Sequence, residues 1–118
     1  MSSLQAGTFE KADEVRSMDK TTVEVVTFGG ATVGRLTMEP GWSWSACVKP
    51  NVGTDSCQNH HVGVVVSGQL HVVHDDGTTM DLTQGDVYEI TPGHDGWVVG
   101  DEAFVGLEFA SADTYGKT

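Results

Sequence analysis

Two cysteines and five histidines are the side chains in this sequence best suited to bind a transition metal. Asp55, Cys57 and His61 stand at spacings of two and four residues. In an extended segment these three side chains project to the same side, because successive side chains alternate between the two faces of a strand. Thiolate, imidazole and carboxylate groups are ligands for zinc, iron, nickel or copper. The segment is therefore a candidate metal site. In the alternative interpretation, Cys57 is a small buried thiol and His61 is a hydrogen-bonded histidine of the core.

His94 is a further candidate ligand. It follows Pro92 and Gly93, which favour a tight connection, and functional side chains gather in such loops. One interpretation is an exposed histidine that hydrogen-bonds to Asp95. The other is a metal ligand that Asp95 orients by accepting a hydrogen bond from the ring. Both remain open at this point.

The remaining histidines and the tryptophans point less clearly to chemistry. His71 and His74 have opposite parity in one predicted strand, so they cannot both face one site. We expect structural roles for both, with His74 in solvent beside a turn. Trp42 and Trp44 share a parity, and they either fill the core or line a ligand pocket.

Composition excludes several classes of protein. The chain has 118 residues, with 6 Lys and Arg against 17 Asp and Glu, for a formal net charge of -11. Such an acidic chain repels phosphate backbones and anionic lipid, so we expect no nucleic-acid partner and no membrane partner. The start of the sequence lacks a basic region followed by an apolar stretch, so we expect a cytoplasmic protein with reduced thiols.

The elements that must position these side chains are short β-strands. From Thr21 onward, runs rich in β-branched residues alternate with Gly, Pro, Asn and Asp, which predicts about nine strands in an all-β sandwich or barrel. The predicted strands are Thr21–Phe28, Ala31–Met38, Trp42–Val48, His60–Val66, Gln69–His74, Thr78–Leu82, Val87–Ile90, Trp97–Val99 and Ala103–Phe109.

The chain reads as one domain with two flanking segments. Residues 1–20 form a polar N-terminal segment that is partly loose or an edge strand, residues 21–112 form the β-barrel, and residues 113–118 form a C-terminal tail. A loop is expected at residues 49–56. The strand His60–Val66 is apolar at both parities, so we expect it to be buried on both faces, with His61 inside the protein.

Two stretches resemble the motifs of the cupin family. Asp55–Gly68 (DSCQNHHVGVVVSG) is similar to the first motif, and Gly85–Trp97 (GDVYEITPGHDGW) is similar to the second. Counting back from Gly68, His61 occupies the family's glutamate position, and Cys57 and Asp55 occupy its two histidine positions. Gly96 occupies the family's last histidine position, two residues after His94. The resemblance implies an all-β cupin fold, the double-stranded β-helix or jelly-roll barrel.

The resemblance also implies a function, although none of the four usual metal positions keeps its usual residue. It implies a site formed by Cys57, His61 and His94, with Asp55 or His60 as a fourth contact. The cofactor expected there is a divalent transition metal (zinc, iron or copper). The expected partners are a small polar molecule inside the barrel and a second copy of the chain in a homodimer. The alternative is a metal-free cupin that binds or senses a small molecule without catalysis.

Overall fold

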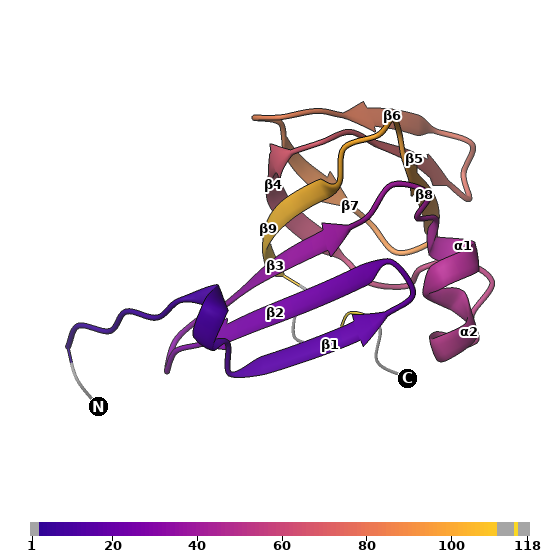
Figure 1. Ribbon diagram of the computed structural model, residues 1–118. Helices are drawn as coiled ribbons and strands as arrows, with labels where there is room; N and C mark the ends of the chain where they lie inside the picture. The colour runs from indigo at the N-terminus through magenta and orange to yellow at the C-terminus, as the bar shows by residue number, and fades with distance from the viewer. Residues whose placement is uncertain (1–2, 111–114, 116–118) are drawn as a thin grey trace.

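The computed structural model describes residues 3–110 and residue 115. Its described part consists of nine β-strands and three short helical segments (Figure 1). The helical segments are η1 (Phe9–Lys11), α1 (Trp44–Cys47) and α2 (Lys49–Val52). The strands are β1 (Glu14–Met18), β2 (Thr21–Thr27), β3 (Thr32–Met38), β4 (His61–Ser67), β5 (Leu70–His74), β6 (Thr79–Leu82), β7 (Val87–Ile90), β8 (His94–Val98) and β9 (Phe104–Ala110).

The strands form two antiparallel sheets. The larger has the order β1-β2-β3-β9-β4-β7, and the smaller has the order β6-β5-β8. In the larger sheet β9 lies between β3 and β4, so a strand late in the chain joins the N-terminal strands to the first motif. One apolar core contains side chains from both sheets, among them Val23, Leu36, Leu70 and Val72. The predicted all-β fold is confirmed.

Alternating burial explains how the strands present their side chains to the core. In β3, Leu36 and Met38 are buried while Arg35 and Thr37 are more exposed, as expected for a strand with one face on the core. His61 is buried at the start of β4, as predicted. The other face of β4 is more open than predicted, because Val66 is 43% exposed.

The predicted strand Trp42–Val48 is wrong, because the chain forms the helix α1 there. Ser43 caps this helix: its side-chain oxygen accepts a hydrogen bond from the backbone N–H of Ala46 at 3.3 Å. The expected loop at residues 49–56 contains α2, which has Pro50 in its first turn and ends at Gly53. A serine cap and a proline at a helix start outweigh the alternating pattern that predicted a strand.

The two flanking segments differ in what the structure describes. Within residues 1–20, η1 precedes β1, which pairs with β2 at the edge of the larger sheet. The predicted tail of residues 113–118 lies outside the described residues except for Tyr115, whose side chain is buried in the core. Among the described residues, no helix has the length and apolarity needed to cross a membrane.

Candidate metal site

Cys57, His61 and His94 converge inside the protein, although His94 lies more than 30 residues after the other two in the chain. Cys57 precedes β4, His61 is the first residue of β4, and His94 is the first residue of β8. All three are buried, and their potential ligand atoms lie within 4.8 Å of one another. The three side chains that the sequence indicated as metal ligands are therefore gathered at one place, between the two sheets.

A main-chain bridge holds Cys57 next to His94. The Cys57 N–H donates to the His94 carbonyl oxygen at 2.7 Å. The Cys57 carbonyl oxygen accepts from the N–H groups of Gly93 and His94, at 2.7 and 3.2 Å. Gly93 has a φ of 101°, a conformation that residues with a side chain rarely adopt. The two candidate ligands are thus placed side by side by the backbone.

The imidazole of His61 lies between the thiol and a buried carboxylate. Its Nε2 is 3.8 Å from the Cys57 Sγ, and its Nδ1 is 2.6 Å from Oε1 of Glu108. The His94 ring meets the His61 ring edge-on, with centroids 5.0 Å apart. The His94 Nδ1–H donates to the Thr91 carbonyl oxygen at 2.8 Å, and a carbonyl oxygen can only accept. His94 therefore keeps the lone pair of its Nε2 available for a ligand role.

Glu108 is the buried acidic residue that the sequence analysis missed. It lies in β9 on the same face as Phe104 and Gly106, and its two oxygens contact different partners. Oε2 accepts a hydrogen bond from the Tyr88 hydroxyl at 2.6 Å. A glutamate at an inward position of an otherwise apolar strand was the signal that would have found it. Tyr115 also packs on the site, with its ring 5.3 Å from that of His61.

Two pKa shifts follow from these contacts. Burial by itself raises the pKa of the Cys57 thiol, but hydrogen bonds and charge interactions with His61 and His94 outweigh it and lower the pKa to about 6. Burial by itself lowers the pKa of His61, but the Glu108 charge and the hydrogen bonds with Cys57 and Glu108 raise it to about 9. At neutral pH these shifts favour a thiolate beside an imidazolium.

A small cavity adjoins the two histidines. Its volume is about 40 Å³, enough for a few water molecules or a ligand of similar size. Most of its walls are apolar or aromatic, and imidazole and carboxyl groups come from His61, His94, Asp95 and Glu108. From the sequence, Trp42 and Trp44 were expected either to fill the core or to line a pocket. Both side chains are buried, and both line this cavity.

The donor set fits a transition metal. Zinc–sulfur and zinc–nitrogen bonds of about 2.3 and 2.0 Å at a tetrahedral angle place the two donor atoms about 3.5 Å apart. The observed distance from Cys57 Sγ to His61 Nε2, 3.8 Å, is close to that value. A thiolate with two imidazoles suits zinc, copper or iron and does not suit magnesium or calcium. This buried cluster can therefore hold a metal ion.

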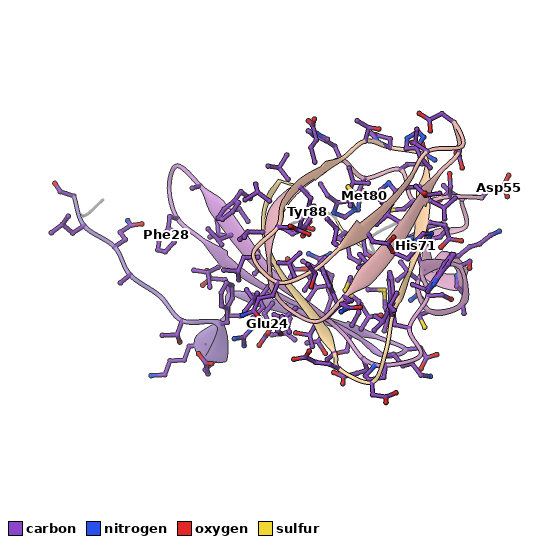
Figure 2. The ribbon with its side chains drawn as sticks, turned by 90° about the horizontal axis from the view of Figure 1, so that it is seen from above. Glu24, Phe28, Asp55, His71, Met80 and Tyr88 are labelled. Carbon is purple, nitrogen blue, oxygen red and sulfur yellow. The ribbon has the colours of Figure 1, made fainter. Side chains whose placement is uncertain are left out.

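The residues considered as additional contacts lie elsewhere. Asp55 points into solvent at the edge of the molecule (Figure 2), 3.9 Å from the Lys49 ammonium. His60 is exposed and contacts Glu89 at 2.8 Å. Both are wrong as fourth ligands, because β4 begins only at His61 and the preceding residues do not continue its alternation.

Asp95 does not orient His94 either. Its Oδ1 accepts hydrogen bonds from the backbone N–H groups of Ser45, at 3.3 Å, and Gly96, at 2.7 Å. It therefore connects α1 to β8. The Thr91 carbonyl oxygen takes the orienting role instead, because His94 starts a strand and its ring folds back over the preceding turn.

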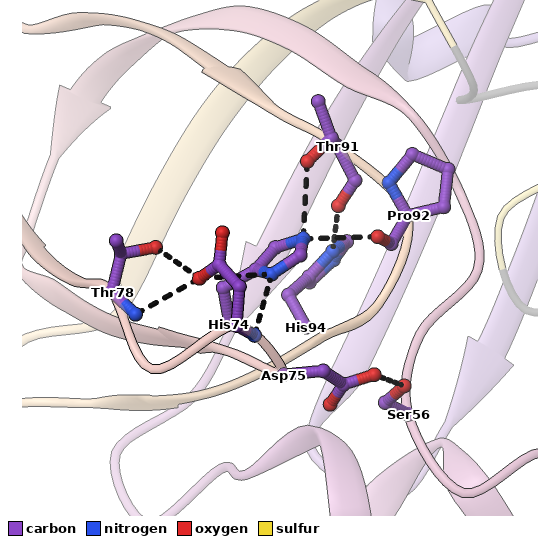
Figure 3. A network of polar contacts seen from close by, with 8 residues as sticks. Ser56, His74, Asp75, Thr78, Thr91, Pro92 and His94 are labelled. Atoms are coloured by element: carbon purple, nitrogen blue, oxygen red, sulfur yellow. Dashed lines mark hydrogen bonds and ion pairs between the residues drawn. The ribbon is translucent and has the colours of Figure 1, made fainter.

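A network of polar contacts supports the turn that carries His94 (Figure 3). The ring of His74 contacts the Pro92 carbonyl oxygen at 3.0 Å and the Thr91 hydroxyl at 3.1 Å. The Ser56 hydroxyl donates to Asp75 at 2.8 Å, which ties the segment before Cys57 to the β5–β6 turn. His74 is thus partly buried and structural. His71 contacts Asp81 at 2.7 Å and packs on Trp97 away from the three ligands.

Comparison with known proteins identifies the fold. No protein-family model and no curated protein sequence matches the chain. A solved structure of unknown function from Rhizobium leguminosarum matches with a TM-score of 0.65 at 20% identity, over 92% of this chain and 97% of that one. A cupin-like protein from Thermotoga maritima matches with a TM-score of 0.53 at 20% identity, over 76% and 67% of the two chains.

A protein with a double-stranded β-helix domain from Klebsiella pneumoniae matches with a TM-score of 0.56 at 18% identity, over 89% of this chain and 87% of that one. The chain has the cupin fold. In this fold, the two motif-like stretches meet at the candidate site, since Cys57 belongs to the first stretch and His94 to the second.

Proposed function

We propose that this cupin binds a divalent transition metal, zinc, iron or copper, through Cys57, His61 and His94, and that the metal centre binds or acts on a small polar molecule. One observation carries the proposal: the buried donor atoms of Cys57, His61 and the sequence-distant His94 lie within 4.8 Å of one another. Burying a thiol and two imidazoles together is costly unless they bind something or pair with each other.

The surrounding residues would give each ligand its role. The Thr91 carbonyl oxygen contacts Nδ1 of the His94 ring, and the Glu108 carboxylate contacts Nδ1 of the His61 ring. In both rings Nε2, on the other side, is therefore the nitrogen available to a metal. Three protein ligands leave a coordination position for water or substrate, and a metal there would supply Lewis-acid or redox chemistry. The cavity of about 40 Å³ beside the histidines would limit that ligand to a few heavy atoms.

The second candidate is a metal-free site that binds a small molecule directly. The observation that favours it is the contact of Cys57 Sγ with His61 Nε2 at 3.8 Å, which already gives each group a partner. A thiolate–imidazolium pair beside a small cavity can bind a polar ligand by charge-assisted hydrogen bonds. A ligand that stabilises the chelator-treated protein against heat would support this alternative.

Metal analysis of the protein tests the proposal. The full chain, purified without added metal, should contain zinc, iron or copper at close to one ion per chain, or should take up zinc after treatment with a chelator. Cobalt titration should produce the intense near-ultraviolet absorption of a thiolate–cobalt bond. A clean protein that takes up none of these ions at micromolar concentration would overturn the proposal.

Adjacent histidines provide a matched control for the ligand assignment. His61→Ala should abolish the thiolate–cobalt spectrum or weaken cobalt binding at least tenfold, since it removes a ligand. His60→Ala removes an exposed ring that contacts Glu89 and should leave the spectrum unchanged. Equal effects of the two substitutions would contradict the assignment.

A further inference from the structure

The outer face of the larger sheet, on the side away from the core, changes from polar to apolar between β3 and β9. One row of paired residues crosses this face from β1 to β7, in the order Val15, Glu24, Arg35, Leu107, Val64 and Val87. Within β2 and β3 the row is an ion pair, and beyond β3 all its residues are apolar. The apolar outward positions of β9, β4 and β7 together form a patch, here called the apolar face: Val62, Val64, Val66, Val87, Leu107 and Phe109.

The apolar face is open to solvent at three of its side chains. Val66 is 43% exposed, Val87 is 78% exposed and Phe109 is 58% exposed. Single exposed apolar side chains are common on proteins, whereas a contiguous group of them marks an interaction surface. This group is contiguous, because β4 pairs with both β9 and β7. The sheet therefore offers a place where another segment of polypeptide can pack.

The N-terminal segment of the chain already covers the other half of the same outer face. Val26 has the same parity in β2 as the outward Glu24, and yet it is buried. Gly7 lies against it, since a Cβ on Gly7 would be 3.1 Å from the Val26 Cγ1. In η1, the ring of Phe9 packs on the Arg35 guanidinium, whose Cζ is 4.9 Å from the ring centroid. This segment is thus chemically suited to the outer face of the sheet.

The residues before η1 form an arm that extends beyond the domain. Residues 3–8 are all exposed and belong to no helix or strand, and Leu4 is 87% exposed. The arm leaves the body of the molecule at the end marked N (Figure 1). Six extended residues span about 20 Å, and neighbouring strands of a sheet lie about 4.8 Å apart. The arm is therefore long enough to cross three strands such as β9, β4 and β7.

Size and charge indicate what kind of partner fits the apolar face. A stable dimer buries about 800 Å² on each partner, whereas three strands of about five residues cover about 250 Å². Arms exchanged between two copies would enlarge the contact on both sides, since a twofold axis repeats every contact. The six side chains of the face are uncharged, so the face does not select a basic partner. It also lets two copies meet there without placing like charges in contact, although each has a formal net charge of -11.

We propose that the apolar face binds a second copy of this chain, in a twofold dimer in which the N-terminal arm of each copy packs across the apolar face of the other. Leu4 enters the contact from the arm, and Val87 and Phe109 are the side chains of the face that it covers. η1 anchors the base of each arm on its own sheet. The dimer does not depend on the candidate metal site, which lies between the two sheets on the inner side.

Sedimentation velocity of the full chain at increasing protein concentration tests the dimer. The wild type should be dimeric at micromolar concentration. Val87→Asn should weaken the dimer at least about tenfold, because a polar amide replaces an apolar contact twice in each dimer. A wild type that stays monomeric would leave another protein as the occupant of the face and would overturn the proposal.

Val15→Asn is the matched control for this substitution. Val15 is also exposed, and it lies in the same row, at the other edge of the sheet. The control should leave the dimer affinity within about twofold of the wild type, as expected of a surface substitution outside the contact. Both positions are exposed, so both variants should keep the circular dichroism of the folded wild type. Equal weakening by the two substitutions would contradict an interface at the apolar face.

Photo-crosslinking tests the exchange of arms. The full chain carrying Leu4→p-benzoylphenylalanine is allowed to exchange subunits with isotope-labelled wild type and is then irradiated. Crosslinks should join position 4 of the unlabelled chain to labelled peptides from β4, β7 or β9. Leu4→Asn should weaken the dimer at least about fivefold, because it removes the apolar side chain of the arm. Crosslinks confined to a single chain, or wild-type affinity of Leu4→Asn, would overturn the proposal.

Discussion

The Tyr88 hydroxyl reaches the Glu108 carboxylate across Gly63, which pairs with Tyr88 on β7 and with Glu108 on β9. The neighbouring strands β7, β4 and β9 therefore place in one row the phenol of Tyr88, Gly63 without a side chain, and the carboxylate of Glu108. A Cβ at the central position would lie 2.4 Å from the Leu107 carbonyl oxygen and 2.8 Å from the Tyr88 hydroxyl. The hydrogen bond that supports Glu108 depends on this glycine.

Replacing Gly63 tests this dependence. Gly63→Ala should lower the free energy of unfolding by about 1–3 kcal/mol, because backbone atoms must move to admit the methyl group. Gly30→Ala is the matched control, since its Cβ would meet no atom within 4 Å, and it should be close to neutral. Denaturant unfolding followed by tryptophan fluorescence gives both values. Equal stabilities of the two variants would contradict the tight fit.

The lowered pKa of Cys57 predicts a thiolate that is visible in the metal-free protein. The absorbance at about 240 nm that thiolates produce should appear with a midpoint near pH 6, because the pKa of Cys57 is lowered to about 6. It should disappear as the pH falls below that value. Cys57→Ser should remove the transition and Cys47→Ser should retain it. A midpoint near pH 8.5 in the Cys47→Ser variant would rule out the interaction with the histidines.

Metal binding should release protons, and the number of protons released per ion should depend on pH. At pH 7.5 Cys57, with a pKa of about 6, is already a thiolate, while His61, with a pKa of about 9, still carries its extra proton. Binding at His61 Nε2 therefore expels about one proton, and affinity should rise about tenfold per pH unit between pH 6.5 and 8.5.

Calorimetry of Zn²⁺ binding in two buffers of different ionisation enthalpy measures this number. Below pH 6 a second proton, from Cys57, should also be released, since its folded pKa lies there. Proton release that stays at zero across this range would show that His61 is neutral before the metal binds. The His60→Ala variant should behave like the wild type.

The contact between Ser56 and Asp75 should stabilise the segment that carries Cys57. Ser56→Ala removes a hydrogen bond of 2.8 Å from a buried hydroxyl and should lower the free energy of unfolding by about 1 kcal/mol. Zn²⁺ affinity should fall a few-fold, because Cys57 is the next residue. Ser45→Ala, on the exposed side of α1, should change neither quantity. A Ser56→Ala variant with wild-type stability would indicate that the contact does not support the site.

The sequence was sufficient for the fold because turn residues and alternating apolar residues repeat along most of the chain. It failed at Trp42–Val48, where Trp44, Cys47 and Val48 also have the spacing of one helix face and the Ser43 cap decides where the helix starts. His61 was placed correctly inside because its neighbours in the strand are apolar. Asp55 was placed wrongly because the parity argument assumed an extended segment before β4.

The convergence of the ligands depended on contacts between distant segments. Spacing alone does not show that Cys57 pairs with His94 through the backbone, since that bridge joins the two sheets. Glu108 was not considered because it lies 47 residues after His61 in the chain. The sequence shows Glu108 only as a glutamate in an apolar strand, and its partners His61 and Tyr88 become known only when β4 and β7 are placed beside β9.

The position of β9 has a consequence for the order in which the site can form. A ribosome synthesises all three ligands before it reaches Glu108, and β4 gains its second neighbour only when β9 inserts beside β3. A nascent chain that exposes Cys57, His61 and His94 still lacks the carboxylate that faces His61. For the proposed metal site, we therefore expect the ion to be acquired after the last strand has been inserted, by the folded protein and not by the growing chain.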